Sequence, residues 1–146
     1  MMLRGVISFL FVTTFTAPVS AEEQTLNWNF TTESGAAYEL AIKGSWEAPG
    51  MAFWKKPSEV SVKGRLEVIK PPEKGTLVYG LCVYFYDKDD FQTLVKDFFI
   101  GQTFLKEGTV FNSNWTMPHD QFLEIHRAAI AFDRTPSSLY RIRDCS

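Results

Sequence analysis

Apolar and polar positions alternate along most of the chain after residue 25, which is the period of a β-strand with one buried face. The alternation is clear in Leu26 to Phe30, in Tyr38 to Ile42 and in the segment EVSVKGRLEVI from Glu59 to Ile69. Gly64 lies inside this last segment and indicates a bend or a close backbone approach. Long helical periodicity is scarce, so the pattern predicts a chain of short strands.

The segment VYGLCVYFYDKDD, from Val78 to Asp90, differs because both of its strand faces are apolar or aromatic. Only one face of a strand can form a simple core face. We expect the odd set to face the core; the opposite assignment, with Cys82 in the core, stays open. The odd set is Tyr79, Leu81, Val83 and Phe85, and the even set is Val78, Gly80, Cys82, Tyr84 and Tyr86.

Further extended pieces follow this segment. FQTLVKDFFIGQTFL, from Phe91 to Leu105, predicts one or two strands, and Thr109 to Met117 predicts another before the turn at Pro118. The tail SSLYRIRDCS, from Ser137, predicts a last strand.

FLEIHRAAIAF, from Phe122 to Phe132, is ambiguous. Helical spacing links Phe122, Ile125 and Ala129, whereas a period of two places the even residues on one side. The strands on either side favour a strand here. The even residues are Phe122, Glu124, His126, Ala128, Ile130 and Phe132.

About eight short strands with turn signals between them predict an all-β fold, a single antiparallel β-sandwich. The chain shows no internal repeat and no linker, so we expect one domain over residues 22–146. The pattern leaves an immunoglobulin-like and a jelly-roll topology open.

The first 21 residues have the layout of a secretory signal peptide. Arg4 precedes an apolar run from Val6 to Ala17, and Val19-Ser20-Ala21 forms a small-residue cleavage pattern. An uncleaved anchor is the alternative, but the run is shorter than the roughly 20 residues of a spanning helix. We therefore expect a secreted or periplasmic protein with no membrane span after cleavage.

The charge of the chain is small, with a formal net value of -2, and the charged residues are scattered. No basic patch or run is visible, which argues against a nucleic-acid partner. Two cysteines are present, Cys82 and Cys145. Export to an oxidising compartment favours a disulfide bond between them over two free thiols. Such a bond would hold the C-terminal segment over the even face that carries Tyr84 and Tyr86.

Residues with candidate chemistry are few. Asp87, Asp89 and Asp90 supply oxygen ligands of the kind calcium prefers, but an EF-hand spacing is missing and a polar hairpin is the favoured explanation. His119 and His126 could suggest a small hydrolase, yet no nucleophile stands on a characteristic turn. We predict no catalytic residues, no metal site and no cofactor.

Aromatic residues are the most suggestive feature. Several lie in or beside SWEAPGMAFWKK, which contains Pro49-Gly50 and predicts a loop. Aromatic rings on loops or strand faces can stack on sugars or anchor a protein partner, although packing into the core is the favoured explanation for any single tryptophan. The candidate binding surface comprises Trp46, Phe53, Trp54, Lys55, Tyr84 and Tyr86.

The stretch VYFYD, Val83 to Asp87, followed by Lys88 and Asp89, resembles the signature of the FxLYD family, small immunoglobulin-like sandwiches of exported bacterial proteins. Tyr86-Asp87 agree with the signature, while Val83 stands where the family has Phe and Phe85 where it has Leu. VKGRLEVI, from Val62, resembles the preceding strand. FLKEG, from Phe104, is similar to a later turn, with Glu107 in place of Pro. The resemblance implies an interaction or accessory module and supplies no catalytic residue.

The order of three further stretches is similar to that of galactose-binding-like jelly rolls, a layout that many carbohydrate-binding modules share. These stretches are FYDKDD, NWTMP and the closing LYRIRD. We therefore carry two functional hypotheses. The first is an exported, non-catalytic protein-interaction or accessory subunit of a larger assembly, and the alternative is a carbohydrate-binding module that uses loop tryptophans.

Overall fold

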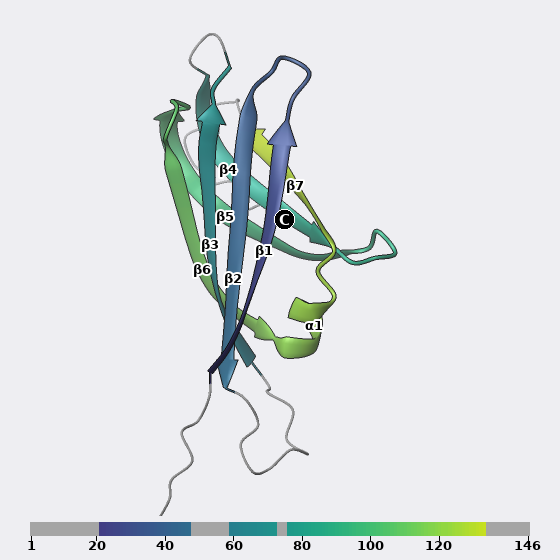
Figure 1. The fold of residues 1–146 in the computed structure, drawn as a ribbon. Helices are drawn as coiled ribbons and strands as arrows, with labels where there is room; N and C mark the ends of the chain where they lie inside the picture. The colour runs from purple at the N-terminus through teal and green to yellow at the C-terminus, as the bar shows by residue number, and fades with distance from the viewer. Residues whose placement is uncertain (1–20, 48–58, 73–75, 134–146) are drawn as a thin grey trace, which may run out of the picture.

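The structure is a computed structural model that describes residues 21–47, 59–72 and 76–133. These residues form seven strands and one short helix, arranged as two antiparallel sheets that pack against each other (Figure 1). The prediction of an all-β sandwich is confirmed.

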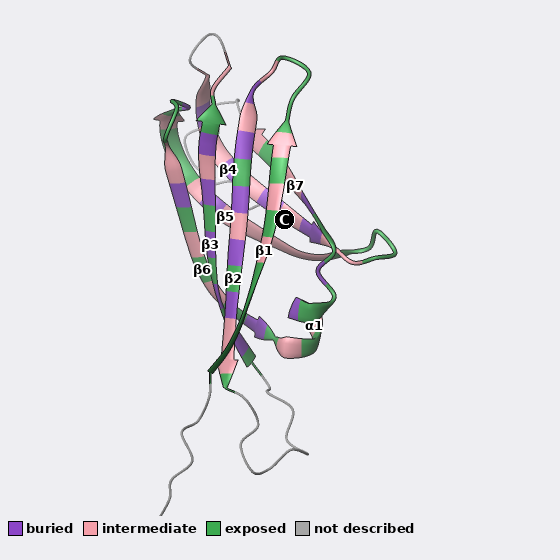
Figure 2. Ribbon diagram, in the orientation of Figure 1, coloured by how far each residue is buried: buried purple, intermediate pink, exposed green. Residues whose placement is uncertain are grey.

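The larger sheet has four strands in the order β1-β2-β3-β6 and is close to regular. Its strand pairings contain a single register irregularity, between Ala37 and Tyr38. Buried residues recur at every second position of the inner strand β3 from Val60 to Val68 (Figure 2), as the sequence pattern predicts. The strands are β1 (Ala21–Thr31), β2 (Ala37–Glu47), β3 (Glu59–Lys70) and β6 (Val110–Pro118).

The smaller sheet has three strands in the order β5-β4-β7 and is irregular. Three register shifts interrupt the pairing of β4 with β5. Each shift makes room for an extra residue, so the segment after Asp90 remains one long strand rather than two. The strands are β4 (Leu77–Tyr86), β5 (Gln92–Phe104) and β7 (Arg127–Asp133).

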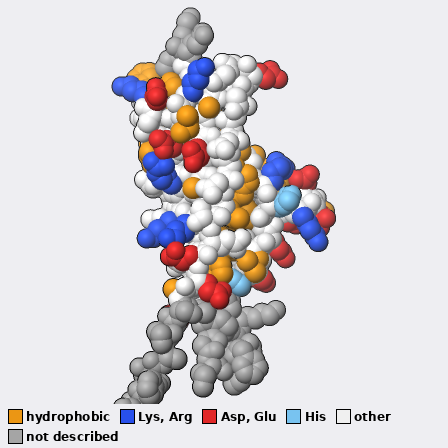
Figure 3. All heavy atoms as spheres, in the orientation of Figure 1, with side chains coloured by type: hydrophobic (Ala, Val, Ile, Leu, Met, Phe, Trp, Pro, Cys, Tyr) orange, Lys and Arg blue, Asp and Glu red, His pale blue; other side chains and the backbone are white. Residues whose placement is uncertain are grey.

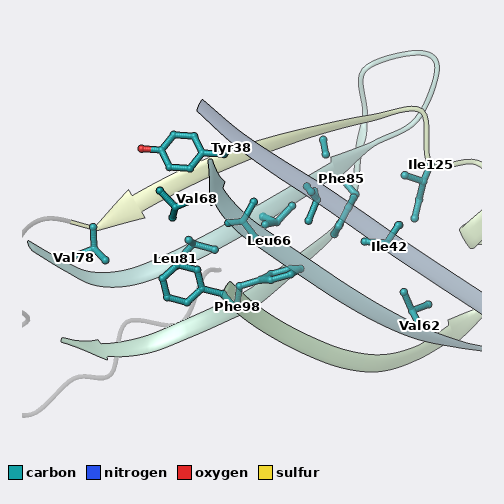
Figure 4. Packing of buried hydrophobic residues seen from close by; sticks show 14 of the residues in the cluster. Tyr38, Ile42, Val62, Leu66, Val68, Val78, Leu81, Phe85, Phe98 and Ile125 are labelled. Carbon is teal, nitrogen blue, oxygen red and sulfur yellow. The ribbon is translucent and has the colours of Figure 1, made fainter. Parts of the chain in front are cut away.

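The two faces of β4 lie as expected over most of its length. Leu81 and Phe85 are fully buried between the sheets (Figure 4), and Val83 is also fully buried. Cys82 is half-buried on the outer face, so the alternative that places Cys82 in the core is wrong. The prediction is wrong at Tyr79, which is only half-buried. The register shift between Val78 and Gly80 reverses the alternation there, and Val78 fills the core position instead.

Trp28 and Trp115 contribute to the core from the two edge strands of the larger sheet. Their rings lie 6.0 and 5.9 Å from the ring of Phe85, measured between centroids. Both side chains are half-buried, which agrees with the core role that their strand positions predict.

For the segment from Phe122 to Phe132, the prediction of a strand is wrong at the start. It begins in helix α1 (His119–Leu123) and only then enters β7. The helix forms because Phe122 is fully buried against Gly44: a Cβ atom at Gly44 would lie 2.4 Å from Cζ of Phe122. Glu124 and His126 are exposed, contrary to the alternation. The strand alternation starts after His126 and buries Ala128.

Candidate functional site

The described residues form a pocket at the end of the smaller sheet. It lies between the β4–β5 turn, residues 87–91, and the connection from α1 to β7, residues 124–126, and has a volume of about 410 Å³. The backbone N–H of His126 donates to the carbonyl oxygen of Tyr86 at 2.8 Å and so holds the two segments together. We call this the turn pocket. Its lining residues are Asp87, Lys88, Asp89, Leu123, Glu124, Ile125 and His126.

Asp87 shapes the β4–β5 turn. Its Oδ1 accepts hydrogen bonds from the backbone N–H of Asp89 at 2.8 Å and of Phe91 at 3.0 Å. Asp90 adopts a φ of 63°, a left-handed conformation that Asp tolerates better than most residues. These contacts fit the polar hairpin. Among the described residues, no group of three or more His, Cys, Asp or Glu side chains is placed to hold a metal ion.

Arg127 ties the first residue of β7 to the same turn. Its Nε lies 3.0 Å from Oδ1 of Asp90, and its guanidinium carbon lies 4.0 Å from the ring centroid of Tyr86. A guanidinium over an aromatic ring is attracted by the π-face. Tyr86, a residue of the predicted binding surface, directly precedes Asp87, which lines the turn pocket.

The turn pocket combines negative charge with exposed apolar groups. Its lining contains three carboxylates, of Asp87, Asp89 and Glu124, against the single ammonium group of Lys88 and the imidazole of His126. Leu123, a lining residue, is 53% exposed, and Phe91, the last residue of the β4–β5 turn, is 70% exposed. No hydroxyl or thiol side chain lines this pocket. The arrangement suits recognition of a cationic group next to an apolar one.

Trp46 does not line the turn pocket. It belongs to β2 of the larger sheet, and its ring packs against His119 at 4.7 Å and Phe122 at 6.0 Å between centroids. Its Nε1 donates to Oε2 of Glu22 at 3.0 Å. The ring is half-buried and much of its surface is used within the protein.

The structure therefore does not bring Trp46 together with Tyr84 and Tyr86, which lie half-buried on the outer face of β4 in the other sheet. The remaining predicted surface residues, Phe53, Trp54 and Lys55, lie outside the described residues. The binding role of all six stays a prediction.

The two histidines occupy different surroundings. His126 is exposed and lines the turn pocket. His119 is half-buried beside Trp46, and its Nε2 is buried without a hydrogen-bond partner in the part of the chain that the structure describes. Neither histidine contacts a serine or cysteine side chain in the described hydrogen bonds, so the hydrolase hypothesis gains no support here.

Cys82 lies on the outer face of the smaller sheet, opposite Asp97 of β5 and Ala131 of β7. Cys145 and the predicted last strand lie outside the described residues. The disulfide bond stays a prediction.

Sequence reasoning did not find the turn pocket, because its two segments are more than thirty residues apart in the chain. The signal that could have pointed to it is Phe91, a large apolar residue directly after the charged run DKDD.

Comparison with known proteins gives no relative from which a role could be carried over. No protein-family model matches the chain, and no curated protein and no solved structure matches it either. Within the described ranges, no helix has the length and apolar character needed to cross a lipid bilayer.

Proposed function

We propose that the chain is an exported, non-catalytic interaction module that serves as an accessory subunit and binds a protein partner through the turn pocket. The observation that carries the proposal is the exposure of Phe91 and Leu123, at 70% and 53%, beside an acidic pocket. Exposed large apolar side chains next to a pocket are the usual anchors of protein interfaces.

The charges of the pocket define the partner's chemistry. Asp89 and Glu124 have no ion-pair partner among the described residues, whereas Asp90 is held by Arg127. A lysine or arginine of the partner would meet these carboxylates, and an apolar neighbour would cover Leu123. Complementary charge raises the association rate and selects the orientation of binding.

Two expectations from the sequence support the proposal. Of the FxLYD-like residues Tyr86 and Asp87, Asp87 lines the turn pocket and Tyr86 directly precedes it, and that resemblance implies an interaction module. The signal-peptide pattern implies export, where a disulfide bond between Cys82 and Cys145 would form.

The carbohydrate-binding alternative used Trp46 and Trp54. The packing of Trp46 against His119 and Phe122, with its Nε1 bonded to Glu22, leaves little of that ring for a sugar. Within the described residues, the alternative then depends on Tyr84 and Tyr86, so we rank it second.

The test is affinity purification of the tagged protein from its native extract. We expect wild type to recover one partner in fixed proportion and the double variant Phe91→Ser/Leu123→Ser to lose it. Phe104→Ser is the matched control, because Phe104 is 54% exposed and lies at the opposite end of β5. Circular dichroism would establish that all variants fold.

Two outcomes would overturn the proposal. In one, the wild-type protein recovers no partner above the background of the untagged extract. In the other, the double variant recovers the same partner as efficiently as Phe104→Ser does. A second variant, Asp89→Asn/Glu124→Gln, removes the charge of two turn-pocket carboxylates that have no ion-pair partner among the described residues. It should weaken partner binding about threefold to tenfold at low salt and less at high salt.

A further inference from the structure

The outer face of the larger sheet contains a shallow hollow of about 490 Å³, away from the turn pocket. Figure 3 views the molecule from this side and shows Lys and Arg side chains with acidic side chains above and below them. We call it the basic hollow. Its lining residues are Thr25, Ala41, Lys43, Lys63, Gly64, Arg65, Asn112 and Asn114.

The strand register concentrates positive charge in the hollow. Lys43 of β2 lies directly opposite Lys63 of β3, and Arg65 follows two residues later on the same face of β3. No acidic residue lines the hollow. Like charges directly opposed across an antiparallel pair are destabilising, so this arrangement costs folding free energy in the unliganded protein.

The acidic partners of these cations lie at the margins of the hollow. Nζ of Lys43 is 2.9 Å from Glu23, and a guanidinium nitrogen of Arg65 is 2.7 Å from Glu67. Lys63 makes no ion pair within the described residues. Solvent-exposed ion pairs contribute little free energy, so an anionic ligand can compete for all three cations.

The shape of the hollow favours an extended ligand over a small ion. It is open and spans all four strands, with short side chains at Thr25 and Ala41. Asn114 stands opposite Lys63, and Asn112 stands opposite Arg65, so an amide group accompanies each cation of β3. Ammonium and guanidinium groups bind carboxylates or sulfates, and amides bind hydroxyl groups.

We infer that the basic hollow binds an acidic oligosaccharide, a chain of sugars bearing carboxylate or sulfate groups. The anionic groups would lie on Lys43, Lys63 and Arg65, and the sugar hydroxyls on the two asparagines. This inference differs from the tryptophan-based alternative because it uses cations on a sheet face. It is independent of the proposed function, which uses the opposite sheet.

The test is isothermal titration calorimetry on protein made in a host that adds no N-linked glycan, because Asn114 stands in the sequon Asn114-Trp115-Thr116. The probes are a heparin-derived sulfated tetrasaccharide, an oligogalacturonide, a neutral cello-oligosaccharide and sodium sulfate. We expect at least one acidic saccharide to bind, with affinity that falls as sodium chloride is raised, and the neutral one not to bind.

Charge-neutralising variants locate the binding. Lys43→Gln/Lys63→Gln should weaken the affinity about tenfold, as expected for two exposed charge contacts. Lys106→Gln, the same change at an exposed lysine between β5 and β6 that lines neither the basic hollow nor the turn pocket, should leave the affinity unchanged. The inference is wrong if neither acidic saccharide binds or if sulfate alone binds as tightly as the saccharides. It is also wrong if Lys43→Gln/Lys63→Gln and the control variant have the same saccharide affinity. None of these outcomes bears on partner recovery through Phe91 and Leu123.

Discussion

The outer faces of the two sheets differ in regularity and in chemistry. The larger sheet has one register irregularity, and its outer face is polar and charged, with Lys43, Lys63 and Arg65 around the basic hollow. The smaller sheet has three register shifts between β4 and β5, and its outer face carries the half-buried aromatic rings of Tyr84 and Tyr86. A regular sheet thus presents charge, and an irregular sheet presents aromatic rings beside a pocket.

Two glycines of the larger sheet make room for aromatic rings from β5 and α1. The shift between Leu81 and Cys82 leaves Phe98 as the extra residue of β5, and its ring is buried above Gly64 of the larger sheet. Phe122 of α1 occupies the corresponding space above Gly44. The larger sheet therefore accommodates two aromatic rings at positions where its strands carry no side chain.

The largest expected effect comes from removing the ring that docks α1. Phe122→Ala should lower the free energy of unfolding by about 3–5 kcal/mol, because a fully buried phenylalanine leaves a cavity. Urea unfolding followed by fluorescence measures this change. Leu123→Ala is the control, since Leu123 is 53% exposed and its truncation should change stability by about 0.5 kcal/mol or less. A similar loss for both variants would contradict the docking role of Phe122.

Reduction of the predicted disulfide bond should have the next effect. Closing the loop between Cys82 and Cys145 stabilises the fold by about 4 kcal/mol in the loop-entropy model, less any native strain. We expect urea unfolding in dithiothreitol to show most of this loss, and alkylation with mass spectrometry to find no free thiol in the oxidised protein. Two alkylated cysteines in unreduced material would refute the bond.

The close contact between Gly64 and Phe98 predicts a smaller loss of stability for a substitution at Gly64. A Cβ atom there would lie 2.6 Å from Cζ of Phe98, so Gly64→Ala should destabilise the protein by about 1–3 kcal/mol through overpacking. Phe98→Leu in the same chain should recover part of the loss by shortening the opposing side chain. Additive losses for the double variant, measured by urea unfolding, would show that the two residues do not oppose each other.

The smallest expected change in stability tests the like charges on the outer face of the larger sheet. Lys63→Gln removes the like-charge pair with Lys43 and should raise stability by about 0.2–0.5 kcal/mol at low salt. The gain should vanish as salt is added, because exposed charges are screened. Ser61→Gln on the same face of β3 is the control for the residue introduced. A loss of stability at Lys63→Gln would mean that the lysines do not repel each other.

Much of the fold was predictable from local pattern. The strands at Tyr38 and Val60 follow from alternation, since a strand with one buried face must repeat its apolar residues every second position. Gly64 was predicted to mark a bend or a close backbone approach, and the ring of Phe98 makes that approach. The local pattern failed at Tyr79 and at Phe122, where a register shift and a docked helix depend on the opposing sheet.

The candidate sites were less predictable. The acidic turn was visible at Asp87 to Asp90, but its partner segment around Glu124 was expected to be part of a strand. The basic hollow was invisible, because Lys43, Lys63 and Asn114 are far apart in sequence and meet only through the register. The predicted surface that groups Trp46 with Tyr86 stays a prediction: these two residues belong to different sheets, and Phe53, Trp54 and Lys55 lie outside the described residues.

The sequence by itself determined that the described chain is built of strands and which face of most strands is buried, because alternation of side chains is a property of each strand alone. Only the tertiary structure decided which strands are neighbours, where register shifts fall and which charges face one another. Those features depend on pairing between distant segments, and the free energy of that pairing is not encoded in any local stretch.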